Sequence, residues 1–443
     1  MILKHGDKRV ISILGHSKVD DKQVYRLSTY TYCYSSGPSH LIRSTLTGEV
    51  VSLSDAEWSL IGPETAGSVT GSAVIDNQLD DLVHRCILVK ADEDDYKRYK
   101  LAVSILKTMD KSKKGVHSYT ILPTTGCNAR CTYCYEEGIK VSTMDEATAA
   151  GTVDFIDRTR SEGEIRITWF GGEPLAANKV ISGICSGLNE RGISFRSEIV
   201  TNASLLTPQL MEEAACNWHL DRAQVSVDGV RSDYEARKQF ADPAAHNYDT
   251  LIDSIGMLLG SGIRTVLRCN YDQGNLEDMI SFWEDIYNRY GADENLKIYA
   301  SMLFQAQKDE ECVVLHRRML ELKSEAIRKG FVLLERKEKT PKLKACLCMA
   351  DSDGKSVVIA PTGELYHCEH LPGNTSFGSI FDGDIVIGSD PRALLEADDR
   401  CRKCPFLPEC TPFRKHGCPD WFEFCDRVKA VESEYLLEGL ISQ

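Results

Sequence analysis

The sequence lacks several features that would assign a protein class at once. Its 443 residues contain no internal repeat and no low-complexity segment. No apolar run reaches the roughly 18–20 residues that a membrane span needs, and the opening MILKHGDKRV has no apolar stretch typical of a signal peptide. Basic residues are also few, since 52 Lys and Arg face 66 Asp and Glu, giving a net charge of −14. These absences predict a cytoplasmic location, with neither a membrane nor a nucleic acid as a partner.

Cysteine, by contrast, is abundant. The chain has 17 cysteines, and the expected cytosolic setting argues against disulfides. Most of them form groups with short spacings, which indicates metal sites. Six others are expected to be small core residues: Cys33, Cys86, Cys185, Cys216, Cys269 and Cys312.

The first zone, residues 1–115, has the pattern of a small mixed module. Alternating stretches at 29–33 and 40–44 predict paired strands across a Ser-Ser-Gly-Pro turn. Ser54 followed by Glu57 predicts a capped short helix. Together with a helix at 79–84 and a strand at 86–89, this composition favours a winged-helix-like domain.

The second zone, residues 116–305, alternates strand and helix patterns, and so predicts an α/β fold. Six strand–helix units imply a parallel sheet with right-handed crossovers, which we interpret as a partial (βα)6 TIM-type barrel. Ligands in such folds bind at the carboxyl ends of the strands. The strands are expected at 118–122, 165–170, 195–201, 223–227, 265–270 and 297–301, and helices at 144–159, 208–218, 248–259 and 275–290.

A bridging helical region is expected at 306–345, followed by a loop-rich domain at 346–443. A segment with little regular structure and many cysteines usually takes its fold from metal. Its eight cysteines are Cys346, Cys348, Cys368, Cys401, Cys404, Cys410, Cys418 and Cys425.

The central motif is a CxxxCxxC triad of Cys127, Cys131 and Cys134, directly after the first predicted strand of the sheet. Three thiolates on one loop can ligate three irons of a [4Fe–4S] cluster, leaving the fourth iron open. An open iron can bind the amino and carboxylate groups of S-adenosylmethionine (SAM), and one electron then produces a 5′-deoxyadenosyl radical. A zinc knuckle or a purely structural cluster is the alternative.

This triad resembles the signature of the radical SAM superfamily. The resemblance implies SAM contacts at motifs that end the following strands, although Ala203 replaces the glycine usual in the third. The implied cofactor-binding residues are Tyr133, Gly171, Gly172, Glu173, Pro174, Asn202, Ser226, Asp228, Arg237 and Arg268.

The late cysteines resemble the SPASM extension of radical SAM enzymes, which holds two auxiliary [4Fe–4S] clusters. Seven residues separate Cys410 from Cys418, where the family pattern has three. The resemblance implies three [4Fe–4S] clusters in all. Cys348, Cys368 and Cys418 would serve the first auxiliary cluster, with Cys346 as its fourth ligand or a spare thiol. Cys401, Cys404, Cys410 and Cys425 would serve the second; a zinc ribbon at the first two of these is the alternative.

The first zone resembles the leader-binding module of maturases of ribosomally made peptides, where a peptide adds a strand to a sheet edge. The favoured hypothesis is therefore a maturase that abstracts a hydrogen from a precursor peptide carrying a leader and forms a crosslink, foremost a Cys thioether. Flavodoxin or ferredoxin would donate electrons. The alternatives are an anaerobic sulfatase-maturating enzyme, which oxidises Cys or Ser to formylglycine, and a metal-stabilised peptide-binding scaffold. Sulfatase maturases typically carry Asp after the cysteine matching Cys368; here Glu369 follows, and it is the candidate catalytic base.

Overall fold

The computed structural model describes residues 2–16, 18–63, 67–110, 114–307, 309–331, 343–344, 346, 348–370, 374–410 and 423–441. The chain divides into two units. Unit 1 comprises residues 1–112, 336–348 and 392–443, and unit 2 comprises 113–335 and 349–391. Each unit thus receives part of the C-terminal domain expected from the sequence, and the expected domain boundaries stay predictions.

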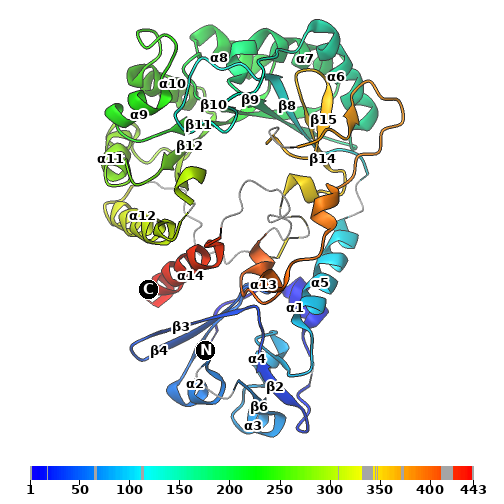
Figure 1. The fold of residues 1–443 in the computed structure, drawn as a ribbon, viewed down its shortest axis with the longest axis vertical. Helices are drawn as coiled ribbons and strands as arrows, with labels where there is room; N and C mark the ends of the chain where they lie inside the picture. Colours follow the sequence, from blue (N-terminus) through cyan, green and yellow to red (C-terminus); the bar gives the residue numbers. More distant parts are fainter. Residues whose placement is uncertain are drawn as a thin grey trace. The chain divides into compact units, whose positions relative to one another are not determined.

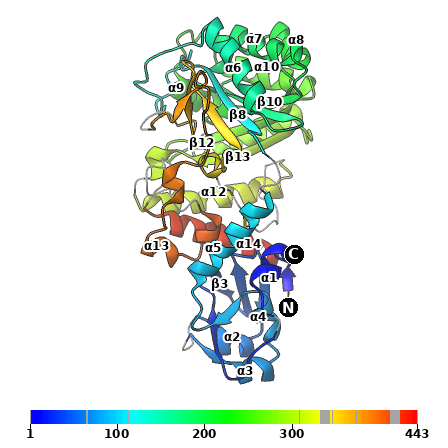
Figure 2. The same ribbon diagram turned by 90° about the vertical axis from the view of Figure 1, so that its right-hand side faces the viewer.

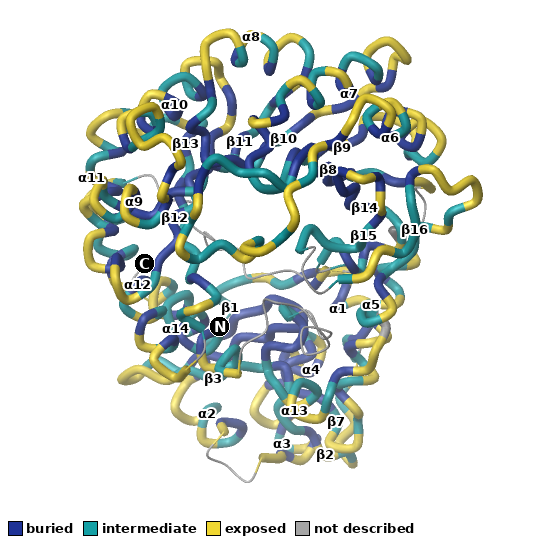
Figure 3. Tube along the Cα trace, turned by 45° about the horizontal axis from the view of Figure 1, so that its top comes forward, coloured by how far each residue is buried: buried dark blue, intermediate teal, exposed yellow. Residues whose placement is uncertain are grey.

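Unit 2 is built on a nine-stranded sheet with the order β13-β12-β11-β10-β9-β8-β14-β15-β16. Strands β8 to β13 pair in parallel with their neighbours in chain order. Figures 1 and 3 show these strands in an arc, with helices on its outer side. The strands are β8 Ser118–Thr124, β9 Ile165–Gly171, β10 Phe195–Thr201, β11 Leu220–Val227, β12 Arg264–Tyr271, β13 Leu296–Met302, β14 Ser356–Ile359, β15 Glu364–Tyr366 and β16 Gly378–Ser379.

The helices of unit 2 pack apolar faces against this sheet in one continuous core. Local sequence signals set their starts: Thr207 accepts a hydrogen bond from Leu210 N, and Pro208 follows it at the first helical position. The helices are α6 Glu146–Thr159, α7 Asn178–Glu190, α8 Pro208–Cys216, α9 Arg231–Lys238, α10 Tyr248–Gly260, α11 Met279–Tyr290 and α12 Glu311–Arg328, with short 3-10 turns η1 Pro174–Ala177, η2 Phe304–Gln307 and η3 Met349–Asp351.

The six expected strands of the parallel sheet are all present, and their order in the sheet follows the chain. A doubly wound sheet would instead reverse its strand order at a switch point. The sequence did not predict the extension beyond β8: β14 pairs with β8 in parallel, and β15 pairs with β14 antiparallel. Residues from the expected C-terminal domain therefore complete this sheet.

Unit 1 contains two small antiparallel sheets, ordered β1-β5-β4-β3 and β6-β2-β7. Ser54 caps α2 in the expected capping box with Glu57. The strands are β1 Ile2–Lys4, β2 Val24–Leu27, β3 Thr31–Ser36, β4 Ser39–Ser44, β5 Val50–Leu53, β6 Val69–Thr70 and β7 Leu88–Lys90; the helices are α1 Lys8–Leu14, α2 Asp55–Ile61, α3 Gly71–Asp76, α4 Asp80–His84, α5 Asp95–Asp110, α13 Asp399–Arg402 and α14 Cys425–Ile441, with short 3-10 turns η4 Pro391–Leu394, shared with unit 2, and η5 Leu407–Glu409.

The expected hairpin at 29–44 is confirmed as β3 and β4, which pair antiparallel. Figures 1 and 2 show α13 and α14, from the far end of the chain, beside β3. Two antiparallel sheets with short helices agree in outline with the expected winged-helix-like module, whose finer assignment stays a prediction. Within the part of the chain that the structure describes, no helix is long and apolar enough to cross a bilayer.

Candidate active site

The loop after β8 is fastened to the end of α9 by backbone hydrogen bonds. Arg130 N donates to the Lys238 carbonyl at 3.0 Å, and Thr132 N donates to the Arg237 carbonyl at 3.0 Å. Ahead of these, Gly126 N is held at 2.9 Å by the Thr124 hydroxyl at the end of β8. The path of the loop is therefore set by the protein framework at the carboxyl end of the sheet.

Cys127, Cys131 and Cys134 all lie on this loop and are half-buried. Cys134 N donates to the Cys131 carbonyl at 3.0 Å, which closes a turn between those two residues. Burial raises the pKa of the Cys127 thiol to about 11, and the charges of Glu173, Cys131 and Cys134 act in the same direction. The three thiols thus share one neighbourhood.

This donor set fits an iron–sulfur cluster. Burial keeps the thiols protonated, and a bound metal would offset that cost by stabilising the thiolates. Among the described residues, no group of three or more His, Cys, Asp or Glu side chains is arranged around a single ion. A [4Fe–4S] cluster instead spreads its ligands over separate irons. Three thiols on one loop can therefore each ligate a different iron of such a cluster.

The end of β9 lies directly against the start of the cysteine loop. Gly171 has a φ of 115°, and a Cβ there would come within 2.3 Å of the Thr124 carbonyl oxygen. A Cβ at Gly172 would come within 2.5 Å of the Gly126 carbonyl oxygen. Only glycine allows this approach. Pro174 then opens the turn η1, and the SAM contacts expected for Gly171, Gly172 and Pro174 stay predictions.

Glu173 is fully buried and its carboxylate joins two strand ends. One oxygen accepts from the Thr201 hydroxyl at 2.6 Å and from Leu175 N at 3.0 Å. The other accepts from Asn202 N at 2.8 Å. Burial raises the pKa of Glu173 in spite of these three hydrogen bonds. In this structure the side chain expected to contact SAM therefore anchors the end of β10, and the SAM contact stays a prediction.

Asn202 lies beside the first cysteine of the loop. Its Nδ2 donates to Asn128 Oδ1 at 2.9 Å and lies 4.0 Å from Cys127 Sγ. Its Oδ1 accepts from the hydroxyl of Ser204 at 2.7 Å. Ala203 between them has a φ of 61°, the left-handed conformation that the glycine of the family motif adopts without strain. The amide of Asn202 is therefore directed at the loop that carries Cys127, Cys131 and Cys134, called the cluster loop below.

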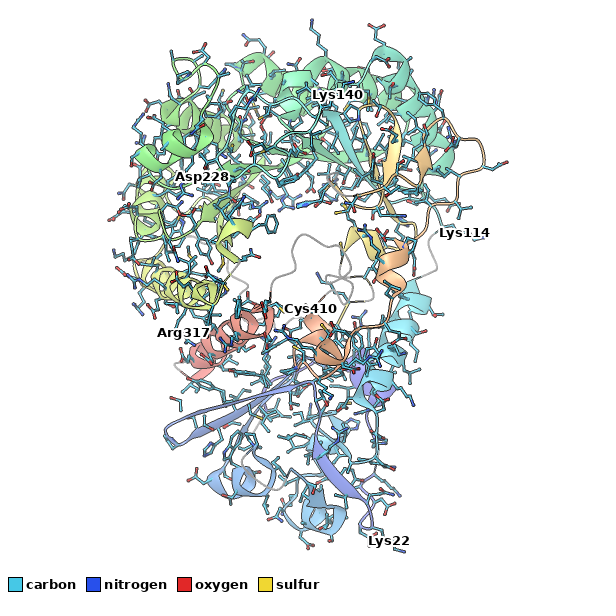
Figure 4. The ribbon with its side chains drawn as sticks, in the orientation of Figure 1. Lys22, Lys114, Lys140, Asp228, Arg317 and Cys410 are labelled. Atoms are coloured by element: carbon cyan, nitrogen blue, oxygen red, sulfur yellow. The ribbon has the colours of Figure 1, made fainter. Side chains whose placement is uncertain are left out.

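A buried polar group joins the cluster loop to β11, β12 and α9. The Tyr133 hydroxyl donates to Asp228 Oδ1 at 2.5 Å, and Lys238 Nζ lies 3.2 Å from Asp228 Oδ2. Asn270 Nδ2 reaches both Asp228 and the Tyr133 oxygen at 3.3 Å. Burial opposes the charge of Lys238, but Asp228 and Tyr133 raise its pKa well above the ordinary lysine value. The ion pair of Asp228 and Lys238 thus fixes Tyr133, which lies between Cys131 and Cys134 in the sequence. Figure 4 labels Asp228.

The predicted arginines have different surroundings. Arg237 forms a two-pronged ion pair with Asp272, at 2.9 and 2.6 Å. Arg268 pairs in register with Ser226 on the neighbouring strand, and its Nη2 donates to the Ser301 hydroxyl at 3.2 Å. Its Nε is buried and has no hydrogen-bond partner among the described residues. Arg268 thus keeps a donor available at the strand ends, while both prongs of Arg237 are engaged.

Glu369 follows β15, and the sheet extension brings it near the cluster loop. The ring of the next residue, His370, lies tilted at 4.2 Å from that of Tyr135 and edge-to-face at 5.7 Å from that of Phe304, centroid to centroid. Burial raises the pKa of Tyr135, Glu369 raises it further, and Arg268 lowers it. The candidate base, an arginine and three rings therefore gather beside the last cysteine of the triad.

Sequence reasoning missed several of these residues. Lys238 directly follows the predicted Arg237. Its position at the end of the short polar helix α9 was the feature of the sequence that could have indicated it. Asn128 lies within the triad motif itself. Tyr135 and His370 each follow a predicted cysteine closely. Their contacts depend on the pairing of β14 with β8, which no local pattern contains.

The predicted first auxiliary set does not form one described site. Cys346 and Cys348 belong to unit 1, whereas Cys368 belongs to unit 2. The Cys368 thiol donates to Glu369 Oε2 at 3.6 Å. Cys418 lies outside the described residues. This ligand set stays a prediction.

The predicted second auxiliary set lies within unit 1. Cys404 N donates to the Cys401 carbonyl at 3.0 Å. Burial raises the pKa of the Cys404 thiol to about 11, and the charges of Cys425 and Cys410 act in the same direction. The thiols of Cys404, Cys410 and Cys425 are therefore close enough to influence one another, and the four-cysteine ligand set stays a prediction.

Parallel strands in chain order, a three-cysteine loop after the first strand and polar groups at the next strand ends define an α/β enzyme with its site at the carboxyl edge of the sheet. Residues 121–281 match the family model of the Radical SAM superfamily. Residues 121–281 of this chain are therefore a radical SAM domain.

Curated relatives and solved structures extend this likeness. The chain is 27% identical over 173 residues to a probable GTP 3′,8-cyclase from Methanocella arvoryzae, covering 39% of this chain and 53% of the relative. It is 28% identical over 160 residues to GTP 3′,8-cyclase 2 from Pseudomonas aeruginosa, covering 35% and 46%. The chain thus spans about half the length of these relatives.

Among solved structures, native anSMEcpe with bound AdoMet has a TM-score of 0.57 at 14% identity, covering 73% of this chain and 98% of that chain. Streptococcus suis SuiB bound to S-adenosylmethionine has a TM-score of 0.51 at 13% identity, covering 91% and 99%. At these identities the likeness concerns the fold.

Proposed function

We propose that this chain is a radical SAM maturase that modifies a residue of a ribosomally made precursor peptide, forming a Cys thioether. The observation that carries the proposal is the combination of a three-cysteine loop in unit 2 with a separate small sheet in unit 1 that ends in strand β3. The fold likeness to SuiB, which covers 91% of this chain, supports it. SuiB has also been solved with its precursor peptide SuiA, at a TM-score of 0.52 to this chain.

Different residues of the chain would bind the cluster and SAM. Cys127, Cys131 and Cys134 hold the first cluster, and the backbone at Gly171 and Gly172 together with other strand-end groups positions SAM. When bound, the cluster and SAM supply a 5′-deoxyadenosyl radical, which takes a hydrogen atom from a peptide carbon, while auxiliary clusters accept an electron.

Glu369 would serve as the base of this reaction. Joining the carbon radical to a cysteine sulfur releases the thiol proton and one electron. The proton would go to the Glu369 carboxylate, and the electron would pass to the clusters held by the auxiliary cysteines. The electron needed to split SAM would come from a donor such as flavodoxin or ferredoxin. The product has lost two hydrogen atoms, and SAM has become methionine and 5′-deoxyadenosine.

The peptide's leader would bind at the end of the β1-β5-β4-β3 sheet. β3 pairs only with β4 among the described strands, so its other edge offers backbone N–H and C=O groups to an added strand. Its outer residues Ser35 and Ser36 are exposed. An extended leader would lie along this edge as an added strand.

The test uses anaerobically reconstituted protein with dithionite, SAM and a short cysteine-containing peptide encoded beside its gene. We expect 5′-deoxyadenosine and a peptide lighter by two hydrogen atoms, with one cysteine protected from alkylation. Protein that contains zinc without iron or sulfide would contradict the proposal and support the metal-stabilised scaffold instead. With all three clusters formed, about twelve irons per chain are expected.

Formylglycine formation is the second candidate. The coverage of 98% of anSMEcpe at a TM-score of 0.57 favours it, as does an acidic residue directly after Cys368. The same assay separates the two reactions. A hydrazide-reactive aldehyde on the peptide would select formylglycine, and a thiol-free crosslink without aldehyde would select the thioether.

A further inference from the structure

The β1-β5-β4-β3 sheet has two differently covered sides. Cys33, Ile42 and Val51 pair across the strands on one side and pack into a core with α2, α3 and α4. On the other side Tyr32 pairs with Arg43, and this side faces the late cysteine segment and α14. We call it the cysteine-facing side, defined by Tyr32, Tyr34, Leu41, Arg43 and Val50.

Side chains of β3, β4 and their flanks hold the residues next to three of the four cysteines. The Tyr30 hydroxyl donates to the carbonyl of Arg402, which follows Cys401, at 3.3 Å. The Thr45 hydroxyl donates to the carbonyl of Pro405, which follows Cys404.

The third cysteine is held through a buried ion pair. Arg43 pairs with Glu409, which precedes Cys410, and the two side chains are only 3% and 8% exposed. A buried arginine and carboxylate hold each other firmly, because removing either leaves an uncompensated charge.

The fourth cysteine begins α14, and this helix is also fixed to the cysteine-facing side. Arg43 donates to the Ser433 hydroxyl at 2.7 Å. The hydroxyls of Tyr32 and Tyr34 donate to Glu434 at 2.9 Å and to Glu438 at 2.7 Å. Leu437 of the same helix is buried against Leu41 and Val50.

The cysteines are held together from the loop side as well. Arg400 donates to Asp426 at 2.9 Å and to the carbonyl of Glu423, so it joins the segment around Cys401 to the start of α14. Figure 4 labels Cys410, which lies beside α13 and α14. The residues beside the four cysteines are therefore fixed either to the cysteine-facing side or to one another.

We infer that the metal site of Cys401, Cys404, Cys410 and Cys425 is the structural support of the β3–β4 hairpin. The inference rests on the proposed function in two respects: that these four cysteines bind a cluster, and that β3 binds the peptide. Loss of the metal releases both segments that cover the cysteine-facing side, since metal-binding energy in loop-rich segments is folding energy. Only the metal-loaded chain then presents an ordered β3 edge.

Hydrogen exchange tests this on the full chain, loaded with iron and sulfide. We compare the wild type, a Cys404→Ala and Cys425→Ala double variant, and a matched Cys131→Ala and Cys134→Ala double variant. Each double variant is expected to lose about four irons per chain. Amides of β3 and β4 should exchange at least about tenfold faster in the first variant and at the wild-type rate in the second.

Three results would overturn the inference: wild-type exchange in β3–β4 after loss of the irons, equal acceleration in both double variants, or full iron content in Cys404→Ala and Cys425→Ala. If the first variant cannot be purified, Arg43→Met with all cysteines intact gives an independent answer. It should release iron to a chelator at least about tenfold faster than the wild type, whereas Lys97→Met, at an exposed pair in the same unit, should not. Equal release rates contradict the inference. A wild type that forms no 5′-deoxyadenosine, yet behaves as expected here, would refute only the proposed reaction.

Discussion

The two cysteine loops of this chain are fixed by different means. The loop of Cys127, Cys131 and Cys134 is tied by backbone hydrogen bonds to the end of α9 and to a nine-stranded sheet. The segment of Cys401, Cys404 and Cys410 is held by side chains of a distant part of the sequence, among them Arg43 and Tyr30. The first loop is thus preorganised by its own framework, while the second depends on contacts that must form together with its metal site.

Removing the three cysteines of the first loop should have the largest effect on activity and little effect on the structure of that loop. We expect Cys127→Ala with Cys131→Ala and Cys134→Ala to abolish 5′-deoxyadenosine formation, because no thiolate remains to hold the cluster that splits SAM. The backbone hydrogen bonds that tie the loop to α9 and to the sheet do not involve the thiols, so hydrogen exchange in β8 and β9 should stay at the wild-type rate. Residual SAM cleavage would show that this loop is not the site.

Replacing Lys238 should test how far unit 2 relies on its buried ion pair. Lys238→Met leaves Asp228 buried without its cation, and we expect a loss of about 3–5 kcal/mol of local stability, measured by hydrogen exchange of β11 amides. Arg231→Met removes a cation from the exposed pair with Asp249 and should cost at most about 1 kcal/mol. Similar losses in both variants would contradict the special role of Lys238.

Acidification should change the stability of the two units in opposite directions. In unit 1, burial alone would raise the pKa of Asp95, but hydrogen bonds from Thr29 N and Arg26 hold it below the ordinary value. Its contribution to stability is present above the ordinary aspartate pKa and is lost as the pH falls through the lower folded value. In unit 2, burial raises the pKa of Glu173. Its contribution is therefore lost as the pH rises through the raised folded value.

The measurement is hydrogen exchange of β2 and β10 amides between pH 7 and pH 3, corrected for intrinsic rates. β10 should gain protection on acidification while β2 loses it. Asp95→Asn should remove the pH dependence of β2, and Glu173→Gln that of β10. Parallel changes in the two strands would show that other groups dominate.

The smallest effect is expected at Ala203. A left-handed alanine costs about 1–2 kcal/mol, whereas its buried methyl group contributes about 0.8 kcal/mol. Ala203→Gly should therefore stabilise unit 2 by up to about 1 kcal/mol, seen as slower exchange at the end of β10. Ala214→Gly, a buried position within α8, provides the control and should be destabilising. A loss at both positions would mean that the backbone strain at 203 is negligible.

Local sequence patterns predicted the parallel strands well, because alternation and buried apolar runs are properties of each strand alone. They missed α9, a short helix rich in charged residues whose Lys238 is nevertheless buried. They also missed the pairing of β14 with β8, since residues more than 200 positions apart leave no periodic signal in common. The triad and Glu369 themselves could be singled out from sequence motifs. The residues that orient them, such as Asn128 and His370, depend on tertiary contacts.

Unit 1 is assembled from both ends of the chain, and this has a consequence for synthesis on the ribosome. The hairpin of β3 and β4 emerges before unit 2, but α14, which covers its cysteine-facing side, is translated only after the whole of unit 2. At about 5–20 residues per second, roughly 20–80 s separate the two events. During that interval Leu41 and Val50 face solvent or a chaperone, and the catalytic sheet of unit 2 is completed first. The nascent enzyme therefore acquires its radical-forming half before the half proposed to recognise its peptide.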